Sequence, residues 1–145
     1  MKYYAVIDTN VIVSSMLKKE SIPGQIVQSV SEGIIIPILN EEILKEYLDV
    51  LSRNKFGLKS EEIADLLARI KRNAVYLKRK QTLEDFVDED DIVFFEIVMS
   101  ARSTMDAYLV TGNMKHYPIR SYVVTPAQMM EIIKKDSSIK NLNNL

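Results

Sequence analysis

Acidic residues stand at three separate places in this sequence where they could bind a divalent metal ion. Asp8 directly follows the strand-like residues 3–7, and Glu46 lies in a segment with the apolar spacing of a helix. The run from Asp88 to Asp91 is the densest run of like charge in the chain. Grouped carboxylates repel one another unless a cation offsets their charge, and Mg²⁺ and Mn²⁺ prefer oxygen ligands. The sequence therefore predicts a metal site built from acids that are far apart along the chain.

Each of these acids also has a purely structural explanation. Asp8 is a good capping residue for the helix expected after it, and a carboxylate such as Glu46, at the edge of an apolar stripe, can reach solvent along its own stem. One acid of residues 88–91 suits the positive end of a helix dipole, and the others could form a solvated turn. We favour the metal site because a cap accounts for only one acid of that run.

The position of Glu46 follows from the geometry of the helix predicted at residues 41–53. The apolar residues that share one side of this helix are Ile43, Tyr47, Val50 and Leu51. At about 100° per residue, Glu46 lies roughly 40° from Val50 and roughly 60° from Ile43. Glu46 is therefore the acid on this helix that best points inward, where a carboxylate needs a cation, a donor or a metal as partner.

A fourth group of polar residues ends a predicted strand at residues 107–110. Thr111 and Asn113 follow this strand and offer neutral oxygens and an amide that can orient a metal-bound water or a carboxylate. The alternative is an ordinary turn from strand to loop. Asp106 precedes the strand, so it belongs to the opposite end of the sheet, and we interpret it as structural.

The composition narrows the chemistry of the site. The chain has 145 residues, no cysteine and a single histidine, His116. Thiolate zinc sites, disulfides, a cysteine nucleophile and a histidine-rich metal site are excluded, so Mg²⁺ or Mn²⁺ held by oxygen is expected. No apolar run approaches the roughly 18 residues that cross a bilayer, and no charged-then-apolar leader comes first. We expect a cytoplasmic protein with no membrane association.

The elements that position the acids alternate between strands and helices. We predict strands at residues 3–7, 34–39, 75–77, 107–110 and 122–124. We predict helices at residues 11–17, between residues 21 and 33, and at 41–53, 61–73, 91–102 and 126–133. This alternation predicts a three-layer α/β/α domain with a central, mostly parallel sheet of four to five strands. The domain should span residues 1–135, followed by a polar, frayed tail at 136–145. Ligands of such sheets bind at the carboxyl ends of the strands, where the strand order reverses.

Four of these motifs, taken in order, resemble the PIN-domain family. The motifs are Asp8-Thr9-Asn10 after the first strand, Glu46 within residues 41–47, the acidic turn 88–91 before an apolar helix, and residues 108–113. In particular they resemble the prokaryotic toxins of toxin-antitoxin pairs (VapC-like). The resemblance runs from about residue 3 to residue 130, nearly the whole chain.

The resemblance implies a metal-dependent endoribonuclease that hydrolyses RNA phosphodiester bonds with Mg²⁺ or Mn²⁺. Asp8, Glu46 and Asp91 match the family's three main acidic positions, which are catalytic and bind the metal. The fourth position, often an aspartate, is Asn113 here, which keeps an oxygen but lacks a negative charge and should weaken metal binding. Asp88 is a candidate substitute ligand.

The resemblance also implies contacts and partners. Asn10, Thr111 and His116 are candidate substrate-binding residues, and a homodimer and an antitoxin protein are the expected partners besides RNA. One dense basic segment is a candidate rim for the RNA backbone, or else a solvated helix face and turn. Its members are Arg69, Lys71, Arg72, Lys78, Arg79 and Lys80.

Two other classes of protein fit part of the pattern. Asn113 suggests a nucleic-acid-binding or regulatory PIN domain with weakened or absent catalysis. A metal-dependent phosphatase or a nucleotide-binding α/β domain would share acids at the sheet edge. Against these last two, the chain has no G-x-G-x-x-G fingerprint and no P-loop, and Asn10 stands where a second aspartate would follow Asp8 in an aspartyl-phosphate phosphatase.

Overall fold

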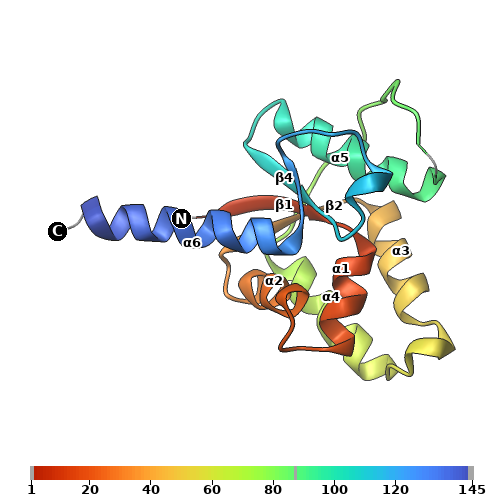
Figure 1. The fold of residues 1–145 in the computed structure, drawn as a ribbon. Coiled ribbons are helices and arrows are strands. Elements are labelled where there is room, and N and C mark those ends of the chain that lie inside the picture. Colours follow the sequence, from red (N-terminus) through yellow and green to blue (C-terminus); the bar gives the residue numbers. More distant parts are fainter. Residues whose placement is uncertain (1, 87, 144–145) are drawn as a thin grey trace.

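The computed structural model describes residues 2–86 and 88–143, and in these residues six α-helices surround a five-stranded sheet (Figure 1). The strands are β1 (Tyr3–Ile7), β2 (Ile35–Leu39), β3 (Val75–Tyr76), β4 (Ala107–Val110) and β5 (Val123–Val124). The helices are α1 (Thr9–Leu17), α2 (Ile22–Ser31), α3 (Glu41–Leu51), α4 (Ser60–Arg72), α5 (Ile92–Arg102) and α6 (Pro126–Asn143). Three short 3₁₀ helices are η1 (Asn54–Phe56), η2 (Glu89–Asp91) and η3 (Met114–His116).

The strands lie in the order β3-β2-β1-β4-β5, and every neighbouring pair is parallel. Helix α5 lies on one face of the sheet and contacts β1, β2 and β4, whereas α2 and α6 lie together on the other face (Figure 1). All five residues of β2 are buried, as expected for a strand covered on both sides. The predicted three-layer α/β/α fold with a parallel sheet is confirmed.

Local signals explain where several helices begin and end. Helix α2 begins after Ser21, whose Oγ accepts a hydrogen bond from the Gly24 N–H at 3.2 Å. It is followed by Gly33, which has a φ of 77° and suits glycine best. Helix α3 begins after Asn40, whose Oδ1 accepts from the Ile43 N–H at 2.8 Å. The Asn40 cap fixes the start of the helix that carries Glu46.

The last helix is longer than its sequence signals indicate. We predicted an end at Ile133, and this is wrong because α6 continues to Asn143. No glycine or proline interrupts residues 134–143, and the Tyr3 hydroxyl donates to Asp136 Oδ2 at 2.8 Å. Residues 136–143 of the expected frayed tail are therefore helical, and 144–145 lie outside the described residues. Neither α6 nor any other described helix combines the length and apolar character needed to span a membrane.

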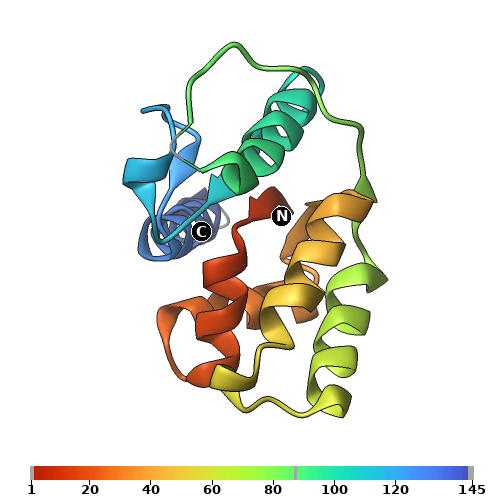
Figure 2. The same ribbon diagram turned by 90° about the vertical axis from the view of Figure 1, so that its right-hand side faces the viewer.

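The carboxyl ends of β1, β2 and β4 meet at one edge of the sheet, and the strand order reverses at β1. From β1 the chain crosses to β2 on one side, and later returns to β4 on the other. Figure 2 looks onto this edge, with α1, α3, the start of α5 and η3 arranged around it. A crevice at this reversal is the usual ligand site of a parallel sheet.

Candidate active site

Asp8 stands at the reversal point, directly after β1. The pairing of Ile7 with Val110 brings Asp8 beside Thr111 at the end of β4. Asp8 Oδ2 accepts a hydrogen bond from Thr111 Oγ1 at 2.7 Å, and the side chain is 4% exposed. Asp8 occupies the N-cap position of α1 without a standard cap hydrogen bond. Besides burial, which raises its pKa, the backbone N–H groups of Thr9 and Asn10 lower that pKa less than the Thr111 and Tyr117 hydroxyls do. Helix capping alone therefore does not explain this buried acid.

Asp91 comes from a different segment and meets Asp8 through a shared tyrosine. It is the last residue of η2, directly before the buried helix α5. The Tyr117 hydroxyl lies 3.3 Å from Asp8 Oδ2 and 3.4 Å from Asp91 Oδ1. His116 Nδ1 lies 3.1 Å from Asp91 Oδ2. Because a phenol has a single proton to donate, the two carboxylates share one donor.

Glu46 approaches the same place from α3. Its side chain is half-buried beside Tyr47, and its Oε2 accepts a hydrogen bond from Thr9 Oγ1 in the first turn of α1. Burial raises the pKa of Glu46 most, and the negative charges of Asp90, Asp8 and Asp91 raise it further. The inward position expected from the helix geometry is thus observed.

Burial is the main reason why the three carboxyl groups have raised pKa values. It raises the pKa of Asp8, and the hydroxyls of Thr111 and Tyr117 oppose that rise without cancelling it. Burial also raises the pKa of Glu46, against the Thr9 hydroxyl. The site therefore holds its negative charge at a cost in free energy.

Neighbouring charges add to this effect at Asp91. Burial comes first, the negative charges of Asp8 and Asp88 raise its pKa further, and His116 lowers it. The pKa of the Tyr117 phenol is itself raised by burial and by the Asp8 and Asp91 carboxylates. Tyr117 therefore keeps its proton and acts as a donor to the acids.

Three other predicted site residues lie around this group without direct side-chain contacts to the acids. Asn113 donates its backbone N–H to Thr111 Oγ1 at 2.9 Å. This bond helps to orient the Thr111 hydroxyl that donates to Asp8. Asp88 is exposed, and its Oδ1 accepts the Asp90 N–H at 2.9 Å as the cap of η2. Asn10 is exposed in the first turn of α1. Asp88 is thus explained by capping, whereas Asp91 is the buried acid of residues 88–91.

The fit of a metal ion can be judged from the oxygen donors. Among residues 2–86 and 88–143, no three His, Cys, Asp or Glu side chains form a ready metal-binding group. Instead, Asp8 and Asp91 share the Tyr117 hydroxyl, and Glu46 accepts a hydrogen bond from Thr9. Each carboxylate is thus held by a hydroxyl donor. Mg²⁺ is commonly bound by one or two carboxylates, with waters and substrate phosphate as its other ligands. The all-oxygen pair of Asp8 and Asp91 fits such an ion.

Sequence reasoning did not identify Tyr117 as a site residue. Its side chain is 5% exposed and contacts both buried acids. One signal could have indicated it: Tyr117 follows His116 in the loop after β4, which begins at the carboxyl edge of the sheet. A hydroxyl-bearing aromatic residue there can turn back toward Asp8.

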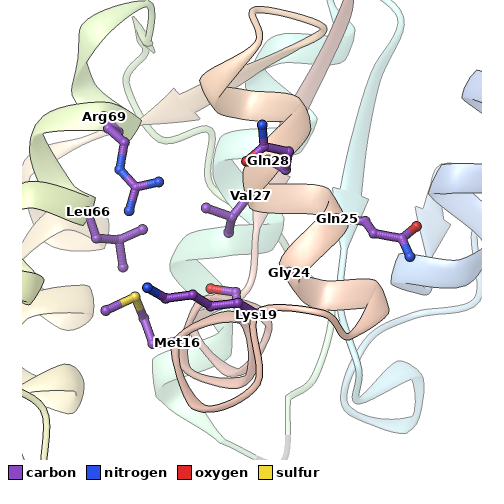
Figure 3. Close-up of a pocket in the computed structure, with 9 residues that line it drawn as sticks. Met16, Lys19, Gly24, Gln25, Val27, Gln28, Leu66 and Arg69 are labelled. Atoms are coloured by element: carbon purple, nitrogen blue, oxygen red, sulfur yellow. The ribbon is translucent and has the colours of Figure 1, made fainter.

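The basic segment predicted as one rim is divided between separate places. Arg69 lies 3.6 Å from Asp65 and lines a pocket of about 250 Å³ between α1, α2 and α4, which contains none of the acids described above (Figure 3). Arg79 pairs with Glu42 and Glu96, at 2.7 Å in each case. The prediction of one continuous rim is wrong, because Arg69 lines a pocket away from the acids, whereas Arg79 is paired with Glu42 of α3 and Glu96 of α5.

Comparison with known proteins agrees with this geometry. A family model described as PIN domain matches residues 4–115, which contain every acid of the site. No curated protein matches the chain. PIN domains are generally nucleases, and a nuclease is a hydrolase. The matched region covers most of the chain and runs from β1 to the end of β4, so the chain belongs to the PIN-domain family.

Proposed function

We propose that this protein is a metal-dependent endoribonuclease that hydrolyses phosphodiester bonds of RNA. One observation carries the proposal: the Tyr117 hydroxyl contacts Asp8 and Asp91 together. Two buried carboxylates from separate segments thus face one point at the edge where parallel sheets bind ligands. Their raised pKa values indicate negative charge that a cation would offset.

The residues that would hold a Mg²⁺ or Mn²⁺ ion are Asp8 and Asp91, with Glu46, Asn113 and Asp88 as further candidates acting directly or through water. When bound, such an ion lowers the pKa of water and offsets charge on the phosphoryl oxygens during in-line attack. The donor set supports the proposal because it consists of carboxylate, hydroxyl and amide oxygens, which hard divalent cations prefer.

The other side chains have distinct roles in this proposal. Thr111 and Tyr117 donate to Asp8 and hold its carboxylate in one orientation. Glu46 accepts the proton from the attacking water, because a raised pKa makes a carboxylate a more effective base near neutral pH. His116, whose side chain is 43% exposed, and the exposed Asn10 contact the RNA strand. Thr111 is fully buried, so it acts on the substrate only through Asp8.

The biological role is proposed on the resemblance described above. The protein would be the toxin of a toxin-antitoxin pair, acting in the cytoplasm as a homodimer and inhibited by an antitoxin protein. Co-purification with the product of a neighbouring open reading frame, together with loss of RNA cleavage in the complex, would support this role. RNA cleavage that is unaffected by such a product would contradict it.

The test of the enzymatic function is cleavage of end-labelled single-stranded RNA with Mg²⁺, with Mn²⁺ and with EDTA. The wild type should cleave in either metal and not in EDTA, and Asp8→Asn and Asp91→Asn should each lose at least about 100-fold in rate. Asp106→Asn is a matched control, since Asp106 is exposed and pairs with Arg102 at the other end of β4. Cleavage that survives both site substitutions would refute the assignment.

A second candidate function is RNA binding without catalysis, as in a regulatory PIN domain. Asn113 favours it, because an amide at this position removes one negative charge from the site. Wild-type protein that binds RNA but cleaves none of a varied set of RNAs with either metal would select this function.

A further inference from the structure

An open hollow lies at the carboxyl end of β3, the edge strand next to β2. It measures about 530 Å³, and its lining includes Tyr76, Lys78, Asn40 and Glu42. The Tyr76 side chain is 48% exposed, and no other described aromatic ring or cation stacks on it. An aromatic face is therefore open to solvent at the same sheet edge as the acids.

A second hollow connects this place to the candidate active site. It measures about 380 Å³, lies between α3 and η2, and has Glu46 and Asp90 in its lining. Glu42 and Arg79 line both hollows. Glu42 and Glu46 are one helical turn apart on α3, so they lie on the same side of it. The surface thus runs from Glu46 past Glu42 and Arg79 to Tyr76.

The two hollows are lined by acids and cations together. Six carboxylates, Glu41, Glu42, Glu46, Asp49, Glu89 and Asp90, lie beside the cations Lys45, Arg53, Lys78 and Arg79. Arg79 is held by Glu42 and Glu96 and shapes the wall between the hollows. Lys45, Arg53 and Lys78 line the hollows, and none of these three forms an ion pair with the residues that the structure describes. These three unpaired cations are the groups that an approaching phosphate backbone can contact. An exposed aromatic ring next to such cations is the combination that binds single-stranded RNA.

We propose that the hollow at Tyr76 binds one nucleobase of the RNA strand outside the bond that is cut, with Lys78 on the adjoining phosphate. This proposal rests on the ribonuclease function proposed above. The base stacks on the Tyr76 ring, and the strand between the two sites passes over Lys45 and Arg53. Because every base has an aromatic face, this contact adds affinity with little preference for sequence.

The test measures equilibrium binding of a fluorescent single-stranded RNA to the full chain with Mg²⁺, in an Asp8→Asn background that stops cleavage. Tyr76→Leu should weaken binding about 5- to 150-fold, the usual range for loss of a base stack, whereas Tyr76→Phe should stay within about twofold. Lys78→Gln should reduce the slope of log affinity against log salt by about 0.7. Tyr4→Leu is the matched control, because Tyr4 lines a separate hollow with Gly33 and Asn73.

Cleavage kinetics separate this proposal from the ribonuclease function itself. With the natural Asp8, Tyr76→Leu should raise KM for an RNA oligomer and leave kcat unchanged, since Tyr76 lies outside the reacting group. Equal binding and KM in Tyr76→Leu and wild type would overturn the base site while leaving the ribonuclease proposal intact. Equal losses in Tyr76→Leu and Tyr4→Leu would also overturn it. If the wild type neither binds nor cleaves RNA, both proposals fail.

Discussion

Replacing Tyr117 by phenylalanine tests whether its hydroxyl serves the two acids. The substitution keeps the ring, which packs edge-on against Phe86 with 6.0 Å between ring centroids. It removes the one donor that Asp8 and Asp91 share, at 3.3 and 3.4 Å. Both buried carboxylates would then lose support for their charged forms, so their already raised pKa values should rise further.

The size of the effect follows from the length of these contacts. A hydrogen bond to a charged group contributes about 1.5–3 kcal/mol, but both contacts are longer than the roughly 2.5–3.0 Å usual for O–H···O bonds. We expect a loss of about 1–2 kcal/mol in the free energy of unfolding at neutral pH. For a chain of this length, Tm should fall by about 3–8 °C.

The pH dependence distinguishes this loss from a general packing defect. The hydroxyl supports the charged carboxylates, so its contribution is present above their pKa values and is lost as the pH falls through them. Tyr47→Phe is the matched control, since the buried Tyr47 hydroxyl donates at 2.5 Å to the Ile7 carbonyl, which does not titrate. Thermal melts of both variants from neutral to acidic pH decide the matter. A Tyr117→Phe deficit that is as constant with pH as that of Tyr47→Phe would refute the reasoning.

Three further predictions each change the charge at one position. Asp8→Asn should raise the free energy of unfolding at neutral pH by about 1 kcal/mol, because burial raises the Asp8 pKa. The wild type should become more stable as the pH falls through that pKa. Scans of Tm against pH should therefore be flatter for the variant than for the wild type. Asn113→Asp should tighten Mn²⁺ binding about tenfold in titration calorimetry, and unchanged affinity would argue against a role in metal binding. Glu96→Gln should cost about 1–3 kcal/mol in thermal melts, because it weakens a buried pair with Arg79. The matched Glu42→Gln change, at the exposed partner of the same arginine, should cost under about 1 kcal/mol, and equal losses would contradict this ranking.

The sheet could be predicted because its information is local. Apolar runs of strand length alternate with helical spacing, and helices must cross between parallel strands. The end of α6 could not be predicted in this way. Its continuation depends in part on Asp136 and Tyr3, which are 133 positions apart in the chain and meet only after the sheet has formed.

For the site residues, too, local signals could be interpreted from the sequence and long-range contacts could not. Asp8 was identified from the end of a strand, and Glu46 from angles around one helix. Tyr117 was missed because its role depends on the loop after η3 turning back to residues 109 and 26 positions away. The prediction for the basic segment was wrong because the sequence shows the charge of Arg79 but not its partners Glu42 and Glu96.

The acids of the site keep raised pKa values even with their hydrogen-bond donors in place, and this links the stability of the site to its function. Protonation, Asp8→Asn and a bound cation all reduce the cost of burying negative charge at Asp8 and Asp91, whereas Tyr117→Phe raises that cost. If Mn²⁺ binds at these carboxylates, it should therefore reduce the stability deficit of Tyr117→Phe and leave that of Tyr47→Phe unchanged. Melts with and without Mn²⁺ measure this difference without any RNA. A deficit in Tyr117→Phe that saturating Mn²⁺ does not alter would place the ion elsewhere, whatever the outcome of the cleavage assays.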